Sequence, residues 1–272
     1  MTQAPLHPLD QALKLEPAGE HRYVGHTSQA YWNMIGPFGG ATAAVMLQAA
    51  LVHPERLGDP IALTVNFAGP IGEGDFEVEA RPSRTNRSTQ HWHLELRQNG
   101  EVTTTGSAVF AVRRQTWNSG EAVMPQVPAA ESLPVMSGFA PVKWLGSYDI
   151  RAVRGAKPTT APGTENPDSL SQFWIRDEPA RTPDYASMAA WCDAFYPRIF
   201  LKRAGFVPAG TVSLTTYFHA DAATLAAVGD SHVLGCAQAR VFRQGFFDQS
   251  AEIWSASGEL LATSHQIVYY KE

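Results

Sequence analysis

The chain has 272 residues but only two cysteines, Cys192 and Cys236, and no Cys-x-x-Cys motif. This scarcity argues against a disulfide framework and a structural zinc site, and it fits a reducing compartment. The formal net charge is −5, so the chain lacks the basic excess of nucleic-acid-binding proteins. No apolar run approaches a membrane-spanning length, and the N-terminus has neither a basic nor an apolar signal region. We therefore expect a soluble, cytoplasmic protein without membrane insertion.

Several catalytic motifs are also missing. There is no Gly-x-Ser-x-Gly for a serine nucleophile, and no Gly-x-Gly-x-x-Gly or Walker loop for a nucleotide phosphate. His91 and His93 share one face of an expected strand, but no third ligand is evident, so we expect no metal site. Chemistry on a small molecule, without a cofactor, is the remaining expectation.

The first part of the chain combines one apolar helix with a series of alternating segments. Ala41–Leu51 is apolar nearly all round and made of good helix formers, which predicts a central buried helix entered through Gly39 and Gly40. The period then changes to two, which predicts antiparallel strands over Ile61–Phe67, Asp75–Arg81, His91–Arg97 and Glu101–Val112. A buried helix against a long antiparallel sheet is an α+β unit.

The same order of helix and sheet returns in the second part of the chain. Residues 117–142 are rich in proline, glycine, serine and alanine and are expected to link a unit at 1–116 to a unit at 143–272. In the second unit we expect strands at Lys143–Val153, Ser171–Asp177, Thr211–His219, Ser231–Phe242, Gly245–Ser255 and Glu259–Tyr270. Leu63–Phe67 resembles Leu214–Phe218, which predicts a duplication with two similar units packed about a pseudo-two-fold axis.

Between these strands lies a helix with a carboxylate at an unexpected place. Thr182 is the expected N-cap, and the helix is expected to carry Asp193 among apolar residues. An ionised aspartate in apolar surroundings is costly unless it is hydrogen-bonded. Asp193 is therefore a candidate catalytic group, and the alternative is a capping or solvated aspartate.

Aligning the two units shows where they differ chemically. Thr211 falls opposite Pro60, and Gln266 falls opposite Ala108, so polar groups able to hold a water occur only in the second unit. Thr211 could also be an ordinary strand residue, and Gln266 could have a structural role, since a buried glutamine needs partners. This asymmetry is expected if a duplicated fold kept one working site.

These residues carry a resemblance to the acyl-CoA thioesterase II family, whose members are double hotdog proteins. The family's Phe-Gly-Gly entry to the buried helix is similar to Met34–Gly40, and its Tyr/Trp-x-x-Asp segment is similar to Ala190–Asp193. Its strand ending in aromatic-Phe-His is similar to Thr211–His219, and its final Leu-x-Ala-Ser/Thr-x-x-Gln strand is similar to Leu260–Gln266. The resemblance covers nearly the whole chain.

The resemblance implies two tandem hotdog units, each with a long antiparallel sheet wrapped on a central helix, and an acyl-CoA thioesterase with the catalytic triad Asp193, Thr211 and Gln266. Thr211 and Gln266 would position a water, while Asp193 would act as base or attack directly. Phe38, Gly39 and Gly40 would bind substrate, with the glycine amides near the oxyanion that develops.

One departure from the family pattern concerns the residues after the threonine. The bacterial enzyme has an Asp-His pair two and three positions later, where this chain has Ser213 and Leu214. The alternative is therefore a double hotdog that binds acyl-CoA or an acylated partner without turnover. An enoyl-CoA hydratase would need an Asp/His pair near a helix start, and none is well placed. Because the double unit completes its own site, a homodimer or larger homo-oligomer is optional.

Overall fold

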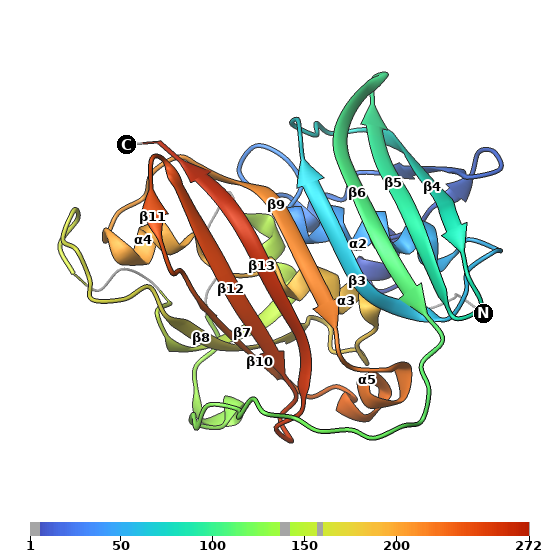
Figure 1. Ribbon diagram of the computed structural model, residues 1–272. Helices are drawn as coiled ribbons and strands as arrows, with labels where there is room; N and C mark the ends of the chain where they lie inside the picture. Colours follow the sequence, from blue (N-terminus) through green and yellow to red (C-terminus); the bar gives the residue numbers. More distant parts are fainter. Residues whose placement is uncertain (1–5, 137–141, 157–159, 272) are drawn as a thin grey trace, which may run out of the picture.

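The computed structural model describes residues 6–136, 142–156 and 160–271. Its strands form one continuous antiparallel sheet in the order β1-β2-β4-β5-β6-β3-β9-β13-β12-β10-β8-β7, and β11 pairs with β12 (Figure 1). The strands of the first half are β1 (Glu16–Pro17), β2 (Arg22–His26), β3 (Asp59–Phe67), β4 (Asp75–Thr85), β5 (Thr89–Gln98) and β6 (Glu101–Ala111). Those of the second half are β7 (Tyr148–Arg154), β8 (Ser171–Asp177), β9 (Ala209–Phe218), β10 (Val233–Gln238), β11 (Phe242–Arg243), β12 (Phe246–Trp254) and β13 (Leu260–Tyr270).

The two halves meet where β3 pairs antiparallel with β9 in the middle of the sheet (Figure 1). Thr64 lies opposite Thr215 in this pair, and their hydroxyl oxygens are 3.0 Å apart. The register runs symmetrically outward from this point, and both β3 and β9 carry a bulge near their first residues. The predicted duplication and the α+β double hotdog architecture are therefore confirmed.

Helix α2 (Gly39–Leu51) lies behind the sheet and is buried over nearly all its length (Figure 1). Its alanines and its glycine at position 40 let it approach α3 (Tyr185–Trp191) of the other half closely. A Cβ atom at Gly40 would collide with the carbonyl oxygen of Ala190 and the ring of Phe38. The two central helices thus form the contact between the halves on this side of the sheet.

The second central helix is shorter than the sequence analysis predicts. Asp184, not Thr182, is the N-cap, since its side chain accepts the backbone N–H of Ser187 at 2.8 Å. The helix ends at Trp191, with Cys192 as C-cap, so the expectation that Asp193 lies within the helix is wrong. Arg181 explains the shift, because its guanidinium bonds to the Asp184 carboxylate at 2.8 Å and fixes that cap.

The segment that joins the halves packs against the second one. Of the predicted linker 117–142, residues 137–141 lie outside the described part of the chain. Ala130 is buried with Trp174 and Trp254, and Pro128 accepts a hydrogen bond from the Trp174 indole. The strand predicted at Lys143–Val153 begins later than expected, because Lys143–Ser147 forms the 3-10 helix η3 before β7.

Short helices complete the structure and were not predicted: α1 (Pro8–Ala12), α4 (Arg198–Lys202) and α5 (Ala222–Val228), with the 3-10 turns η1 (Gln29–Tyr31) and η2 (Ala130–Ser132). They are too short for a helical period to stand out in sequence. Among the described residues, no helix is long and apolar enough to span a membrane.

Candidate active site at the seam of the two halves

Asp193 lies in the turn directly after α3, and its backbone N–H donates to the carbonyl of Ala190 at 3.1 Å. The preceding helix is anchored by Asp177, a wholly buried carboxylate at the end of β8. Asp177 accepts hydrogen bonds from the Ser187 hydroxyl and the Trp191 indole, each at 3.1 Å. This anchor fixes the rotation of α3 and so the direction in which Asp193 leaves the helix.

Gln266 connects the other two predicted residues. Its Nε2 donates to Oδ1 of Asp193 at 2.8 Å and to the carbonyl of Cys192 at 3.3 Å. Its Oε1 accepts a longer hydrogen bond, 3.4 Å, from the Thr211 hydroxyl. The structure therefore brings Asp193, Thr211 and Gln266 together from a turn and two neighbouring strands, as the sequence analysis expects.

The N-terminus of α2 in the other half meets the same carboxylate. The backbone N–H of Gly40 hydrogen-bonds to Asp193, and a Cβ atom at Gly39 would lie only 2.6 Å from Oδ2 of Asp193. Phe38 is the N-cap residue of α2, and its buried ring stacks on Trp144 with 4.3 Å between centroids. Only glycine leaves room at position 39 for the carboxylate to reach the positive end of the helix.

The surroundings of Asp193 change its acidity. Burial raises the pKa of this carboxyl to about 7, although the hydrogen bonds from Gln266 and Gly40 act in the opposite direction. The residue as a whole is not fully buried, since part of Asp193 remains in contact with solvent. A carboxyl group with a pKa near neutral pH is suited to accept and return a proton.

The corresponding positions in the first half carry no such polar set. In the first half Ala108 of β6 pairs with Leu63 of β3, and in the second half Gln266 of β13 pairs with Leu214 of β9. Pro60 lies directly before the bulge in β3, and Thr211 lies directly before the bulge in β9. The predicted equivalences of Pro60 and Ala108 are therefore confirmed by the register.

One residue near the site was missed in the sequence. The Ser264 hydroxyl donates to the carbonyl of Cys192 at 3.4 Å, beside the bond from Gln266. Ser264 precedes Gln266 by two positions and so lies on the same face of β13. Strand alternation could have identified it.

Arg113 and His219 lie away from the site. Arg113 donates to the carbonyls of Pro60, Phe218 and His219, at the opposite end of β9 from Thr211. The ring of His219 contacts the Thr263 hydroxyl at 3.0 Å, which fits a packing role. These contacts explain both residues without a ligand.

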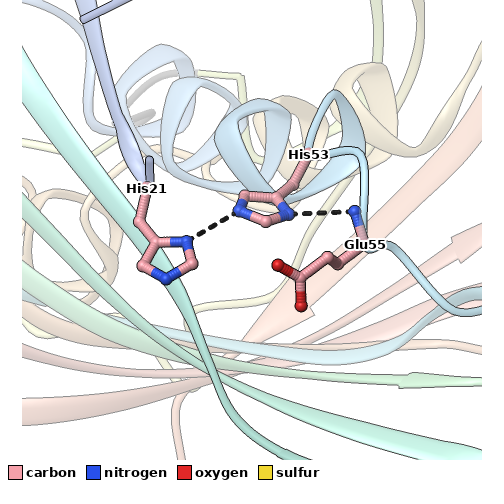
Figure 2. Close-up of side chains that lie close together, drawn as sticks. All are labelled: His21, His53 and Glu55. Atoms are coloured by element: carbon pink, nitrogen blue, oxygen red, sulfur yellow. Dashed lines mark hydrogen bonds between the residues drawn. The ribbon is translucent and has the colours of Figure 1, made fainter. Parts of the chain in front are cut away.

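A separate cluster of His21, His53 and Glu55 has the residue types of a metal site, with ligand atoms within 4.8 Å of one another (Figure 2). However, Nδ1 of His53 accepts the backbone N–H of Glu55 at 3.1 Å, so the neutral ring carries its proton on Nε2. That Nε2 lies 3.0 Å from Nδ1 of His21 and can donate to it. Both nitrogens of His53 are thus engaged, and we interpret the cluster as a contact between the β1–β2 turn and the end of α2.

Taken together, the fold and the site define a double hotdog protein with one polar site at the seam between its halves. Family models agree: the acyl-CoA thioesterase N-terminal domain matches residues 28–111, and the acyl-CoA thioesterase C-terminal domain matches residues 121–270. The chain belongs to the acyl-CoA thioesterase family, and its class of activity is thioester hydrolysis.

Solved structures with the same fold cover almost the entire chain. A conserved protein of unknown function with a hot dog fold from Alicyclobacillus acidocaldarius is 47% identical, with a TM-score of 0.92 over 98% of this chain and 99% of that one. A putative thioesterase II from Thermobifida fusca is 20% identical, with a TM-score of 0.83 over 99% of both chains. The acyl-CoA thioesterase II TesB2 from Mycobacterium marinum is 19% identical, with a TM-score of 0.77 over 97% of this chain and 98% of that one. No curated protein gives a significant match.

Proposed function

We propose that this protein hydrolyses a fatty or other acyl-CoA to the free acid and coenzyme A through a water held by Asp193 and Thr211. The observation that carries the proposal is the hydrogen-bonded chain from Thr211 through Gln266 to Asp193. Because the Thr211 hydroxyl donates its hydrogen bond to Gln266, the hydroxyl oxygen remains free to accept a hydrogen bond from a water. A water that donates to both Thr211 and Asp193 keeps a lone pair for the thioester carbon.

In the proposed reaction, the water oxygen bonds to the carbonyl carbon while its proton passes to Asp193. The carbonyl oxygen becomes an oxyanion, for which we assign the backbone amide of Gly39 at the start of α2 as a donor. The carbon–sulfur bond then breaks, and the leaving thiolate takes the proton from Asp193. Gly40 keeps its amide for the carboxylate, and Phe38 supports this helix start through its stack on Trp144.

The proposed site needs no second copy of the chain. Asp193 and Gln266 come from the second half and Gly39 and Gly40 from the first, so one chain supplies both sides of the seam. Homo-oligomers remain compatible with this arrangement. We also propose a cytoplasmic location, which the free thiols of Cys192 and Cys236 support.

A second candidate function is acyl-CoA binding without turnover, favoured by the residue beside Gln266. Leu214 pairs with Gln266 across β9 and β13 and is buried, so an apolar side chain stands where the bacterial enzyme has a histidine. Release of free coenzyme A from a panel of acyl-CoA esters of different chain length, followed with a thiol reagent, separates the two candidates. Catalytic release supports hydrolysis, whereas saturable binding without release supports the second candidate.

The pH dependence of the reaction should report on Asp193. The ionised form is the base, so kcat/KM is expected to rise with pH and level off above an apparent pKa of about 7. Because the hydrogen bond from Gln266 lowers this pKa, Gln266→Ala should move the midpoint to higher pH. The matched control is Gln98→Ala, since Gln98 is a buried glutamine that holds Gly72 far from the site. A midpoint that is the same in wild type and both variants would argue against Asp193 as the base.

The same ionisation should affect stability with the opposite trend. The folded protein holds the Asp193 proton up to about pH 7, whereas an unfolded carboxyl loses it near 3.8. The contribution of this group to stability is therefore present below pH 3.8 and is lost as the pH rises through 7. Activity and this part of the stability are expected to change in opposite directions over the same interval.

A further inference from the structure

The turn that carries Asp193 is followed by an arginine whose side chain is entirely buried. Arg198 is the first residue of α4 and has an exposed fraction of 0%. Among the residues that the structure describes, no carboxylate forms an ion pair with it. A buried guanidinium without a counter-charge is costly unless hydrogen bonds satisfy its protons, so its place in the fold calls for an explanation.

The partners of Arg198 connect the turn to the sheet. Its Nε donates to the carbonyl of Tyr196 at 2.8 Å, and Nη2 donates to the same oxygen. Its Nη1 donates to the carbonyl of Ser169 at 2.9 Å, the hydroxyl of Ser171 at 2.7 Å and the carbonyl of Ala237 at 3.1 Å. Ser171 and Ala237 are paired residues of β8 and β10, so one side chain ties the turn to two strands.

Aromatic packing supports the same segment. The Arg198 guanidinium lies 5.9 Å from the centre of the Phe195 ring, which packs on Phe173 with 4.8 Å between centroids. Gly235 leaves the space for both rings, since a Cβ atom there would lie 3.1 Å from each. The turn is therefore held at its Phe195 side chain and its Tyr196 carbonyl, directly after Asp193.

We infer that Arg198 is a positioning residue for Asp193: its hydrogen bonds to the turn and to two strands keep the carboxylate aimed at Gln266 and Gly40. The anchor at Asp177 fixes the helix before Asp193, and Arg198 fixes the turn after it. The forked guanidinium suits this role because its N–H groups reach several acceptors in different directions at once. A lysine ammonium is a single compact charge and cannot span acceptors on separate elements in this way. The inference rests on the proposed function for its kinetic part only.

The test compares Arg198→Met with Arg151→Met. Arg151 is the control because it also holds backbone carbonyls, those of Ala130 and Leu133, but lies in β7 away from the site; unlike Arg198 it also pairs with the Asp149 carboxylate, so its loss is at least as disruptive locally. At a temperature where both variants are fully folded, we expect Arg198→Met to lose at least 30-fold in kcat with KM changed less than about threefold, on the scale of misplaced catalytic groups. Arg151→Met should retain the kcat of wild type.

A second readout does not depend on turnover. Titration of the Asp193 carboxyl by carbon-13 NMR should show its pKa falling by at least one unit in Arg198→Met, because a released turn lets water reach the carboxylate. Should Arg198→Met fail to fold, Ser171→Ala takes its place, since it removes only one of the acceptors of Arg198. We expect this variant to lower kcat about threefold to tenfold and to lower the pKa of the Asp193 carboxyl by less than Arg198→Met would.

Absence of hydrolysis in the wild type would contradict the proposed function, while the NMR titration would still test the role of Arg198. A folded Arg198→Met, or Ser171→Ala in its place, with the carboxyl pKa of wild type would overturn the inference. A kcat of Arg198→Met equal to that of the Arg151→Met control would also overturn the inference.

Discussion

Replacing Asp193 with asparagine is expected to lower kcat by about three orders of magnitude, the scale of general base catalysis. The amide has nearly the shape of the carboxylate but cannot accept a proton from water. Binding of a non-hydrolysable thioether analogue of acyl-CoA, measured by calorimetry, should stay within a few-fold of wild type, because the missing charge acts in the transition state.

The matched control for this variant is Asp184→Asn at the other end of α3. Asp184 is the N-cap of the helix, and asparagine caps a helix about as well as aspartate. The variant loses the ion pair with Arg181, but Arg181 still donates to the Ser187 hydroxyl of the same helix, so activity should be retained. Equal rates of hydrolysis for wild type and Asp193→Asn would show that this carboxylate is not the base. A parallel loss of analogue binding would instead indicate that the asparagine variant has a disordered site.

The second large effect is expected from Gly40→Ala. The added methyl group would collide with the Ala190 carbonyl and the Phe38 ring, so α2 must move away from α3. Overpacking of this kind costs about 3 kcal/mol, which should lower Tm by about 5 to 10 °C in a chain of this size. Activity should fall as well, because the Gly40 amide that bonds to Asp193 moves with the helix.

The control for this substitution is Gly146→Ala in η3. A Cβ atom at Gly146 would meet no atom within 4 Å, and its backbone needs no left-handed conformation. Thermal unfolding and kcat of Gly146→Ala should match those of wild type. If Gly40→Ala were equally stable and active, the close approach of the two helices would not be what holds the site together.

Much of the fold was predictable because both halves have clear periodic patterns. Most alternating segments became strands close to their expected limits, such as Ser171–Asp177, and the apolar run after Gly40 became α2. The strand expected at Ser231–Phe242 is instead divided into β10 (Val233–Gln238) and the short β11 (Phe242–Arg243). The start of α3 was placed wrongly because Thr182 and Asp184 are both good N-caps in sequence. The choice depended on Arg181, which contacts Asp184 only in the folded chain.

The site was predictable in its residues but not in its geometry. Comparing the halves singled out Thr211 and Gln266, because their counterparts Pro60 and Ala108 have no polar side chain. The hydrogen bond between Gln266 and Asp193 joins elements far apart along the chain, so no local pattern contains it. Arg198 was missed for the same reason, since an arginine next to an apolar segment resembles a surface charge in sequence.

The amino-acid sequence by itself determined the two helix-and-sheet halves, their duplication, and which half kept polar side chains, because strand and helix periods are local properties of the chain. Only the tertiary structure decided that Gly40 of one half faces Asp193 of the other. That contact, with the burial that raises the pKa of Asp193 to about 7, arises when α2 and α3 pack across the seam. Its physical cause is desolvation, which depends on all the atoms that surround a group and not on its neighbours in sequence.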